Sequence, residues 1–250
     1  MYPGHKGVTM YRSIFTIQIL CQFFVVSLNA QASMTVLDVY QSLPKEAFAL
    51  DGTQHRYEIA QLGNKWKTKS IVGYEMDVVV DLENGYIEIV DRGTGGGFIN
   101  HELSIFDSKK RGRVVALNSL GGDGTRASSA GIKFFVREAS SWKDVTAEVL
   151  PGIDWTMFYQ SNQWNMEDLK KGVQIAAREK IELVRYKIPR IGTTLRASFL
   201  RENIIIRGQY TTSGLSQEES RILASMVNTL ARSRIMLRWD KENGVFRLPD

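Results

Sequence analysis

Hydrophobic and polar residues alternate with a period of two along most of the stretch 71–149. The clearest strand-like runs are 74–81, 99–105, 114–117 and 132–136. Turn signals rich in glycine, asparagine and aspartate separate these runs. Strand-like runs that recur about every 12 to 15 residues and are joined by such turns predict an antiparallel β meander.

Two segments follow the helical period instead. Thr35 and Asp38 have the spacing of a capping box and precede an apolar face, so they predict a first short helix. Ser216 and Glu219 have the same spacing and precede an apolar stripe. We therefore predict a second helix over 216–233.

The remaining strand-like segments lie at 181–188, 194–200 and 204–206, and a closing hairpin covers 234–248. These elements predict an α+β fold, which is predominantly an antiparallel β meander with a C-terminal helix and flanking strands. Residues 33–160 would hold the first helix and the meander, and residues 161–250 a β-rich part with the helix 216–233. The two parts form either one continuous domain or two.

One sequence pattern occurs twice, as Asp81–Gly85 and Asp240–Gly244, each time between two strand-like runs. Calcium loops also combine Asp and Asn, but they need a distal bidentate acid that both segments lack. Glycine adopts the positive φ that the end of a tight turn requires. We therefore interpret both segments as hairpin turns.

Residues 1–32 have the pattern of a cleavable signal peptide. Arg12 gives a positive start, 14–28 is mostly apolar and uncharged, and Ala30-Gln31-Ala32 has the small-x-small pattern of a cleavage site. A membrane-spanning helix needs roughly 20 apolar residues, whereas this run has about 15. We expect an exported protein, periplasmic or secreted, with no membrane span after cleavage. Met10 is an alternative start to Met1.

Composition narrows the class of protein further. Cleavage would remove the single cysteine, Cys21, so the mature chain would have no disulfide. It would also remove Lys6, Arg12 and no acidic residue, which lowers the net charge from +5 to +3. A chain this long buries enough apolar surface to fold without disulfides. The modest positive charge is not typical of a nucleic-acid-binding protein.

No motif for catalysis or for cofactor or metal binding stands out. His101-Glu102 begins like a zinc-protease motif, but Ile105 occupies the position of the second histidine. The glycine-rich segment 93–97 lacks the third glycine and the following helix of a dinucleotide-binding loop. His101 is in phase with Leu103, and we expect it at the edge of the core face. The sequence therefore predicts no cofactor, no metal site and a non-enzymatic protein.

Carboxylates on neighbouring strands keep one enzymatic alternative open. Glu75, Asp77 and Glu88 fall on adjacent strand-like runs. Glycosidases use two carboxylates that face each other across the substrate. The alternative function is therefore a carboxylate-dependent hydrolase that acts on envelope carbohydrate.

A basic strip provides the one candidate binding site. The segment 183–207 contains a single acidic residue and several cations, and our candidates are Arg185, Lys187, Arg190, Arg196 and Arg207. Arg185 and Lys187 share one strand face, and Arg196 would lie across a hairpin from them. A basic surface attracts anionic partners such as an acidic glycan or an acidic envelope protein. The other interpretation is an ordinary solvated face whose charges are balanced by acids elsewhere.

Three segments together resemble a known group of proteins: 79–97, 142–151 and 186–194. They resemble exported proteins of unknown function from Bacteroidetes-type bacteria. The resemblance covers most of the mature chain and implies export and a compact α+β fold, but it supplies no functional residues. We therefore expect an exported binding or interaction protein of the cell envelope.

Overall fold

The computed structural model describes nine stretches of the chain. These are residues 34–50, 53–93, 96–123, 126–153, 155–159, 166–179, 183–200, 215–228 and 230–249. The predicted signal peptide, the predicted strand 204–206 and Arg207 lie outside the described residues.

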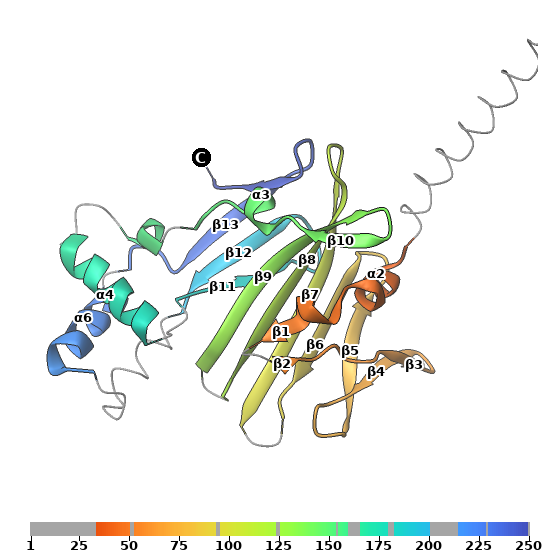
Figure 1. Cartoon of the computed structure of the whole chain (residues 1–250), viewed down its shortest axis with the longest axis horizontal. Coiled ribbons are helices and arrows are strands. Elements are labelled where there is room, and N and C mark those ends of the chain that lie inside the picture. Colours follow the sequence, from red (N-terminus) through yellow and green to blue (C-terminus); the bar gives the residue numbers. More distant parts are fainter. Residues whose placement is uncertain are drawn as a thin grey trace, which may run out of the picture.

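The main element is an eight-stranded antiparallel sheet (Figure 1). Its strands follow the order of the chain: β3 (Ala60–Leu62), β4 (Lys65–Lys69), β5 (Glu75–Asp81), β6 (Tyr86–Asp91), β7 (Gly97–Ser108), β8 (Gly112–Asp123), β9 (Arg126–Glu138) and β10 (Ser141–Asp144). Each strand therefore pairs with the next one along the chain, which confirms the predicted meander.

The meander differs from the prediction at two places. It begins at β3 rather than near residue 71, because β4 has only Trp66 as an apolar member of its inward face and the alternation is hard to recognise. Gly121 and Gly122 belong to one of the turn signals that separate the strand-like runs 114–117 and 132–136, but they lie within β8, where a β-bulge shifts the register to β9. Glycine is common at such bulges.

A second sheet has four antiparallel strands in the order β11-β12-β13-β14. These strands are β11 (Val184–Lys187), β12 (Thr194–Phe199), β13 (Arg234–Asp240) and β14 (Val245–Arg247). The pair β11–β12 and the pair β13–β14 are hairpins, whereas β12 and β13 are neighbours although a helix separates them in the chain. This sheet confirms the predicted flanking strands and the closing hairpin.

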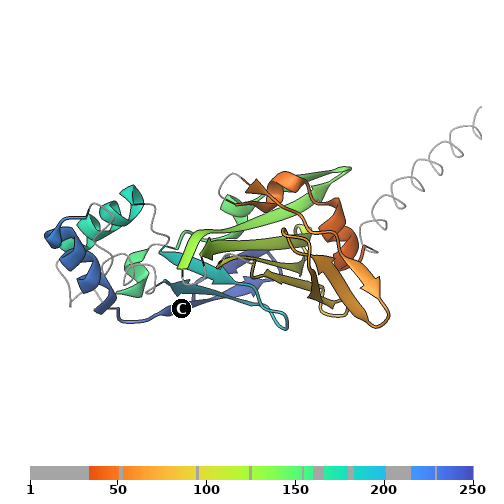
Figure 2. The ribbon, with the colours of Figure 1, turned by 90° about the horizontal axis from the view of Figure 1, so that it is seen from below.

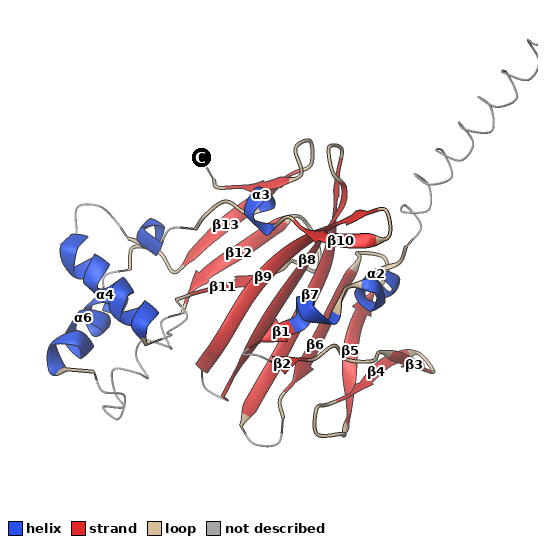
Figure 3. Ribbon diagram, viewed as in Figure 1, coloured by secondary structure: helices blue, strands red, loops and turns tan. Residues whose placement is uncertain are grey.

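Short helical and bridging elements complete the fold (Figure 3). They are α2 (Val36–Ser42), η2 (Lys45–Phe48), α3 (Thr146–Val149), η3 (Trp155–Phe158), α4 (Met166–Arg178) and α6 (Gln217–Asn228), with the small pair β1 (Ala49–Leu50) and β2 (Thr53–Gln54). The predicted capping box at α2 is present, since Thr35 and Asp38 each bond the other's backbone N–H.

The C-terminal helix is shorter than predicted. The sequence suggested 216–233, but α6 ends at Asn228. Beyond it, the backbone N–H groups of Ala231 and Arg232 both donate to the carbonyl of Phe158, at 3.0 and 3.2 Å. These tertiary hydrogen bonds replace the helical ones, so the chain turns toward η3 and enters β13.

Helices α4 and α6 pack against each other at one end of the molecule (Figures 1 and 2). Gly172 lies at their contact, where a Cβ atom would come within 2.1 Å of the Met226 Sδ atom. The absence of a side chain at this position therefore allows the close approach, although glycine lowers the intrinsic helix propensity of α4.

The eight-stranded sheet lies between two other layers (Figure 2). On one face it packs against α2 and η2, with Tyr40 and Phe48 among the buried residues. On the other face it packs against the four-stranded sheet, and this core includes Phe134 and Leu237. The run 114–117 is at most 1% exposed, because consecutive residues of this central strand point to opposite faces and both faces are covered.

The core between the two sheets contains residues from both predicted parts of the chain, 33–160 and 161–250. The two parts therefore pack together over a shared apolar surface.

Both predicted hairpin turns are confirmed. Gly85 and Gly244 have φ values of 62° and 68°, which is the left-handed conformation expected at these positions. In each turn the aspartate accepts a hydrogen bond from the backbone N–H of the asparagine, Asp81 from Asn84 at 3.0 Å and Asp240 from Asn243 at 3.1 Å.

Candidate functional site

The four-stranded sheet has one apolar face and one basic face. Leu195, Ala197 and Leu237 are fully buried against the eight-stranded sheet. Because side chains alternate along a strand, the residues between them face the other way. Four of these are arginines, which we call the outer basic face: Arg185, Arg196, Arg234 and Arg238.

The outer basic face spans three neighbouring strands. Arg185 is opposite Ser198, and Ser198 is opposite Arg234. Two residues from Ser198 on β12, Arg196 lies between Lys187 on β11 and Met236 on β13. The pairing confirms that Arg196 lies across the hairpin from the two cations of β11.

None of the four arginines forms an ion pair with another described residue. Arg185, Arg234 and Arg238 are exposed, and Arg196 is half-buried. The Nε atom of Arg196 is buried without a hydrogen-bond partner among the described residues. On the neighbouring edge strand, Arg247 is instead neutralised by Asp240 at 2.6 Å. The outer basic face is therefore a group of cations that have no carboxylate partner in the described part of the chain.

Two of the predicted binding cations form ion pairs with carboxylates of the eight-stranded sheet. Lys187 forms ion pairs with Glu88, at 3.0 Å, and with Glu102. Arg190 donates from Nε to the Oδ2 atom of Asp81 at 2.8 Å. We call these five residues the inter-sheet ion cluster, because their ion pairs connect β11 and the turn after it to β5, β6 and β7.

The most buried member of the inter-sheet ion cluster is Glu102, whose side chain is 1% exposed. Its Oε2 atom accepts hydrogen bonds from Asn118 Nδ2 at 3.0 Å and from the backbone N–H of Ile188 at 3.1 Å. Asn118 Nδ2 also donates to the carbonyl of Tyr186 at 2.8 Å. A buried carboxylate is tolerated only with such partners, so this cluster joins the two sheets.

The hydrogen bonds that Asp81 accepts in the inter-sheet ion cluster change the pKa of its carboxyl group. The hydrogen bond from Arg190 is the largest of several that stabilise its ionised form, and bonds from Asn84 add to it. Together they lower the pKa of Asp81 to about 2. Arg190 is therefore paired with a permanently charged partner at neutral pH.

The structure thus divides the predicted basic strip. Arg185 and Arg196 lie on the outer basic face, Lys187 and Arg190 belong to the inter-sheet ion cluster, and Arg207 lies outside the described residues. Arg234 and Arg238 were not predicted from the sequence as members of this surface. Their alternation with buried Ile235 and Leu237 in the closing hairpin was a usable signal, but the sequence did not indicate that β13 pairs with β12.

The sequence predicted His101 at the edge of the core face, whereas the structure buries it in the core with 2% exposure. Its Nδ1 atom lies 2.8 Å from the Ser119 hydroxyl, and its ring contacts those of Phe48 and Tyr57 edge-on. Burial lowers the pKa of His101 to about 4, so the ring is neutral at physiological pH.

The carboxylates considered for hydrolysis are bound to lysines. Lys67 forms ion pairs with Glu75 at 3.1 Å and Asp77 at 2.7 Å, and Glu88 belongs to the inter-sheet ion cluster. Within the described stretches, no three His, Cys, Asp or Glu side chains gather in a possible metal site. No helix in the described part of the chain has the length and apolarity needed to cross a membrane.

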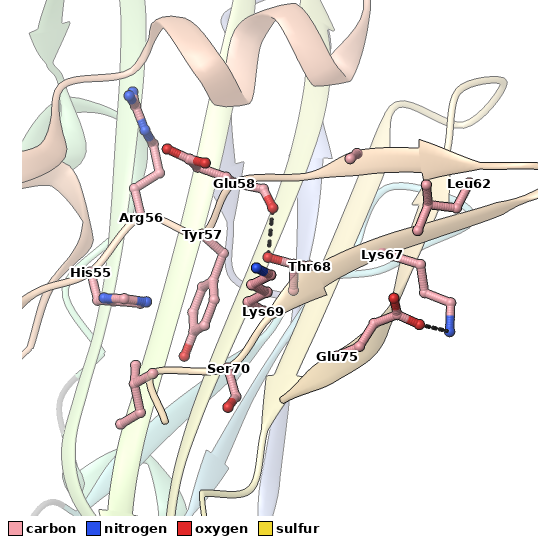
Figure 4. A pocket seen from close by; sticks show the side chains of 12 residues that line it. His55, Arg56, Tyr57, Glu58, Leu62, Lys67, Thr68, Lys69, Ser70 and Glu75 are labelled. Atoms are coloured by element: carbon pink, nitrogen blue, oxygen red, sulfur yellow. Dashed lines mark hydrogen bonds and ion pairs between the residues drawn. The ribbon is translucent and has the colours of Figure 1, made fainter. Parts of the chain in front are cut away.

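A cavity of about 480 Å³ lies beside β3 and β4 (Figure 4). Several of its polar groups bond to the protein itself. The Tyr57 hydroxyl donates to Asp91 at 3.0 Å, and Thr68 Oγ1 donates to the carbonyl of Glu58 at 2.6 Å. Arg56 Nη1 donates to the carbonyls of two residues in and after α2. Much of the polar lining therefore stabilises the cavity walls, in contrast to the arginines of the outer basic face.

Comparison with known proteins gives no family for this chain. No family model matches it, and no curated protein matches it. Among solved structures, a domain of an uncharacterized protein from Porphyromonas gingivalis W83, a member of the Bacteroidetes, is similar to it. The two share 14% sequence identity with a TM-score of 0.45, over 77% of this chain and 80% of that chain. A likeness at this level supports no argument about function.

Proposed function

We propose that this chain is an exported, non-enzymatic binding protein of the cell envelope, and that its outer basic face binds an anionic glycan. The observation that carries the proposal is the presence of four arginines on one face of a sheet with no carboxylate paired to any of them among the described residues. The leader-like pattern of residues 1–32 supports export to the periplasm or beyond the cell.

The chemistry of arginine supports an anionic ligand. A guanidinium group presents several N–H donors in a planar fork that matches a carboxylate or sulfate group. Cations on neighbouring strands repel each other. An anionic ligand relieves this repulsion.

A surface formed by side chains of three neighbouring strands suits a polymer better than a small molecule. Small ligands are usually bound in concave sites that cover most of their surface. An extended polysaccharide can instead contact several arginines at once, and each contact adds to the others by multivalency. We therefore favour a polymeric acidic glycan.

The proposal is tested by removing the four charges together. We expect the Arg185→Gln, Arg196→Gln, Arg234→Gln, Arg238→Gln variant to lose at least tenfold in affinity for acidic polysaccharide, measured by titration calorimetry at low and high salt. The wild-type affinity falls as salt rises because the contacts are charged.

A matched control removes the same number of charges from scattered exposed positions: Lys45→Gln, Lys65→Gln, Lys110→Gln and Lys241→Gln. We expect this variant to bind within twofold of the wild type. A thermal melt verifies that both variants fold. If the two variants bind equally well, the outer basic face is not the binding site and the proposal fails.

A further inference from the structure

The cations of the outer basic face form a regular diagonal. Arg196 lies one strand over from Arg185 and two residues further along, since Arg185 is opposite Ser198. Arg238 repeats the same step, because Arg196 is opposite Met236. The three arginines therefore cross three strands in equal steps, whereas Arg234 lies off this line.

The strand geometry gives the length of each step. Neighbouring strands are about 4.8 Å apart and two residues span about 6.7 Å along a strand, so each diagonal step between Cα atoms is about 8 Å. Each step is longer than a single pyranose ring, so a polymer with an acidic group on every ring would place more charges along this line than there are arginines. A sugar polymer with one acidic group on every second ring matches the number of arginines more closely.

Lys187 lies beside Arg185 and Arg196 on this face, but it is paired with Glu88 and Glu102. The other side chains between the arginines of the diagonal are uncharged. Met236 lies on the same face, and its side chain is exposed to 45%. Thr194 and Ser198 are half-buried members of the same face on β12. The apolar side chain can pack against a sugar ring, and the two hydroxyls can hydrogen-bond to sugar hydroxyl groups. A polymer that carries only charged groups has neither rings nor hydroxyls to offer.

We propose that the outer basic face recognises a linear polysaccharide in which acidic sugars alternate with neutral ones. This inference rests on the proposed function and specifies its ligand. Arg185, Arg196 and Arg238 contact successive acidic groups, and Met236 contacts a neutral sugar between two of them.

Comparing the affinities of three anionic polymers distinguishes recognition of alternating acidic sugars from general attraction to anions. Hyaluronan carries one carboxylate on every second sugar, polygalacturonate carries one on every sugar, and polyphosphate is densely charged without sugar rings. Affinities are measured at one ionic strength and expressed per charge. We expect hyaluronan to bind at least fivefold more tightly per charge than the other two polymers.

A relocated charge tests the diagonal directly. The double variant Arg196→Gln with Ser198→Arg keeps the net charge but places three arginines in one row and leaves Arg238 distant from them. We expect its affinity for hyaluronan to fall at least fivefold, while its affinity for polyphosphate stays within twofold. An equal loss for both polymers would contradict the inference.

Two single substitutions at exposed positions of β13 test the diagonal without the double variant. Arg238→Gln removes a cation from the diagonal, and Arg234→Gln removes one beside it. We expect the first to weaken hyaluronan binding at least threefold more than the second, and equal losses would overturn the inference.

The outcomes also separate the inference from the proposed function. If the wild type binds all three polymers equally per charge, the alternation inference fails and the proposed function stands. If it binds none of them but binds vesicles of anionic phospholipid, both are wrong and the face is a membrane-contact surface.

Discussion

Two groups of cations on the same hairpin differ in what surrounds them. Lys187 and Arg190 reach carboxylates of the eight-stranded sheet, whereas Arg185 and Arg196 have no such partner among the described residues. Arg185 and Lys187 are only two positions apart on β11. The difference shows that a basic stretch of sequence can combine cations that form ion pairs between the sheets with cations that have no carboxylate partner among the described residues.

The largest effect that separates the two groups is expected at Lys187. In the Lys187→Gln variant, Glu102 stays buried but loses its cation. A buried hydrogen-bonding group left without its partner costs about 1–3 kcal/mol, and a charged group costs more. We therefore expect the free energy of unfolding in urea to fall by at least about 1–3 kcal/mol.

Arg185→Gln is the matched control for this prediction, because it removes the same charge from the same strand. Substitutions at exposed sites without specific partners usually change stability by less than about 0.5 kcal/mol. Equal destabilisation by the two variants would show that the inter-sheet ion cluster does not join the sheets as described.

A smaller, pH-dependent effect is expected at Arg190. Its hydrogen bond holds the pKa of Asp81 at about 2, below the ordinary value of 3.8. As the pH falls from about 4, the unfolded chain therefore binds a proton at this group before the folded chain does. The stabilisation is complete above pH 4 and is lost as the pH falls toward 2.

We expect Arg190→Gln to lower the melting temperature at pH 6 by less than Lys187→Gln does, and the difference from the wild type to shrink at pH 3 and further at pH 2.5. Thermal melts at these three pH values provide the measurement. A difference that stays constant would mean that Asp81 is not the partner through which Arg190 acts.

Much of the fold could be predicted from local sequence signals. The capping box of α2, the turns Asp81–Gly85 and Asp240–Gly244, and strands β5 to β9 each depend on neighbouring residues. Strand β4 was not predicted, because Trp66 is its only apolar residue and the strand shows no clear alternation of apolar and polar residues. The end of α6 escaped prediction because it depends on bonds to Phe158, far away in the chain.

The candidate site was less predictable because its residues depend on contacts between segments that are far apart in the chain. Arg185 and Arg196 could be identified because they share a hairpin. The role of Lys187 could not, since its partner Glu88 precedes it by 99 positions. Arg238 could not be assigned to the site either, because β12 and β13 pair although α6 lies between them in the sequence.

The most direct measurement is an arginine footprint. Modification of the chain by phenylglyoxal is followed residue by residue by mass spectrometry, with and without hyaluronan. We expect the polysaccharide to protect Arg185, Arg196 and Arg238, and to leave Arg221, on the exposed side of α6, fully reactive. Protection at Arg221 equal to that at these three, or no protection at any of them, would contradict binding at the outer basic face.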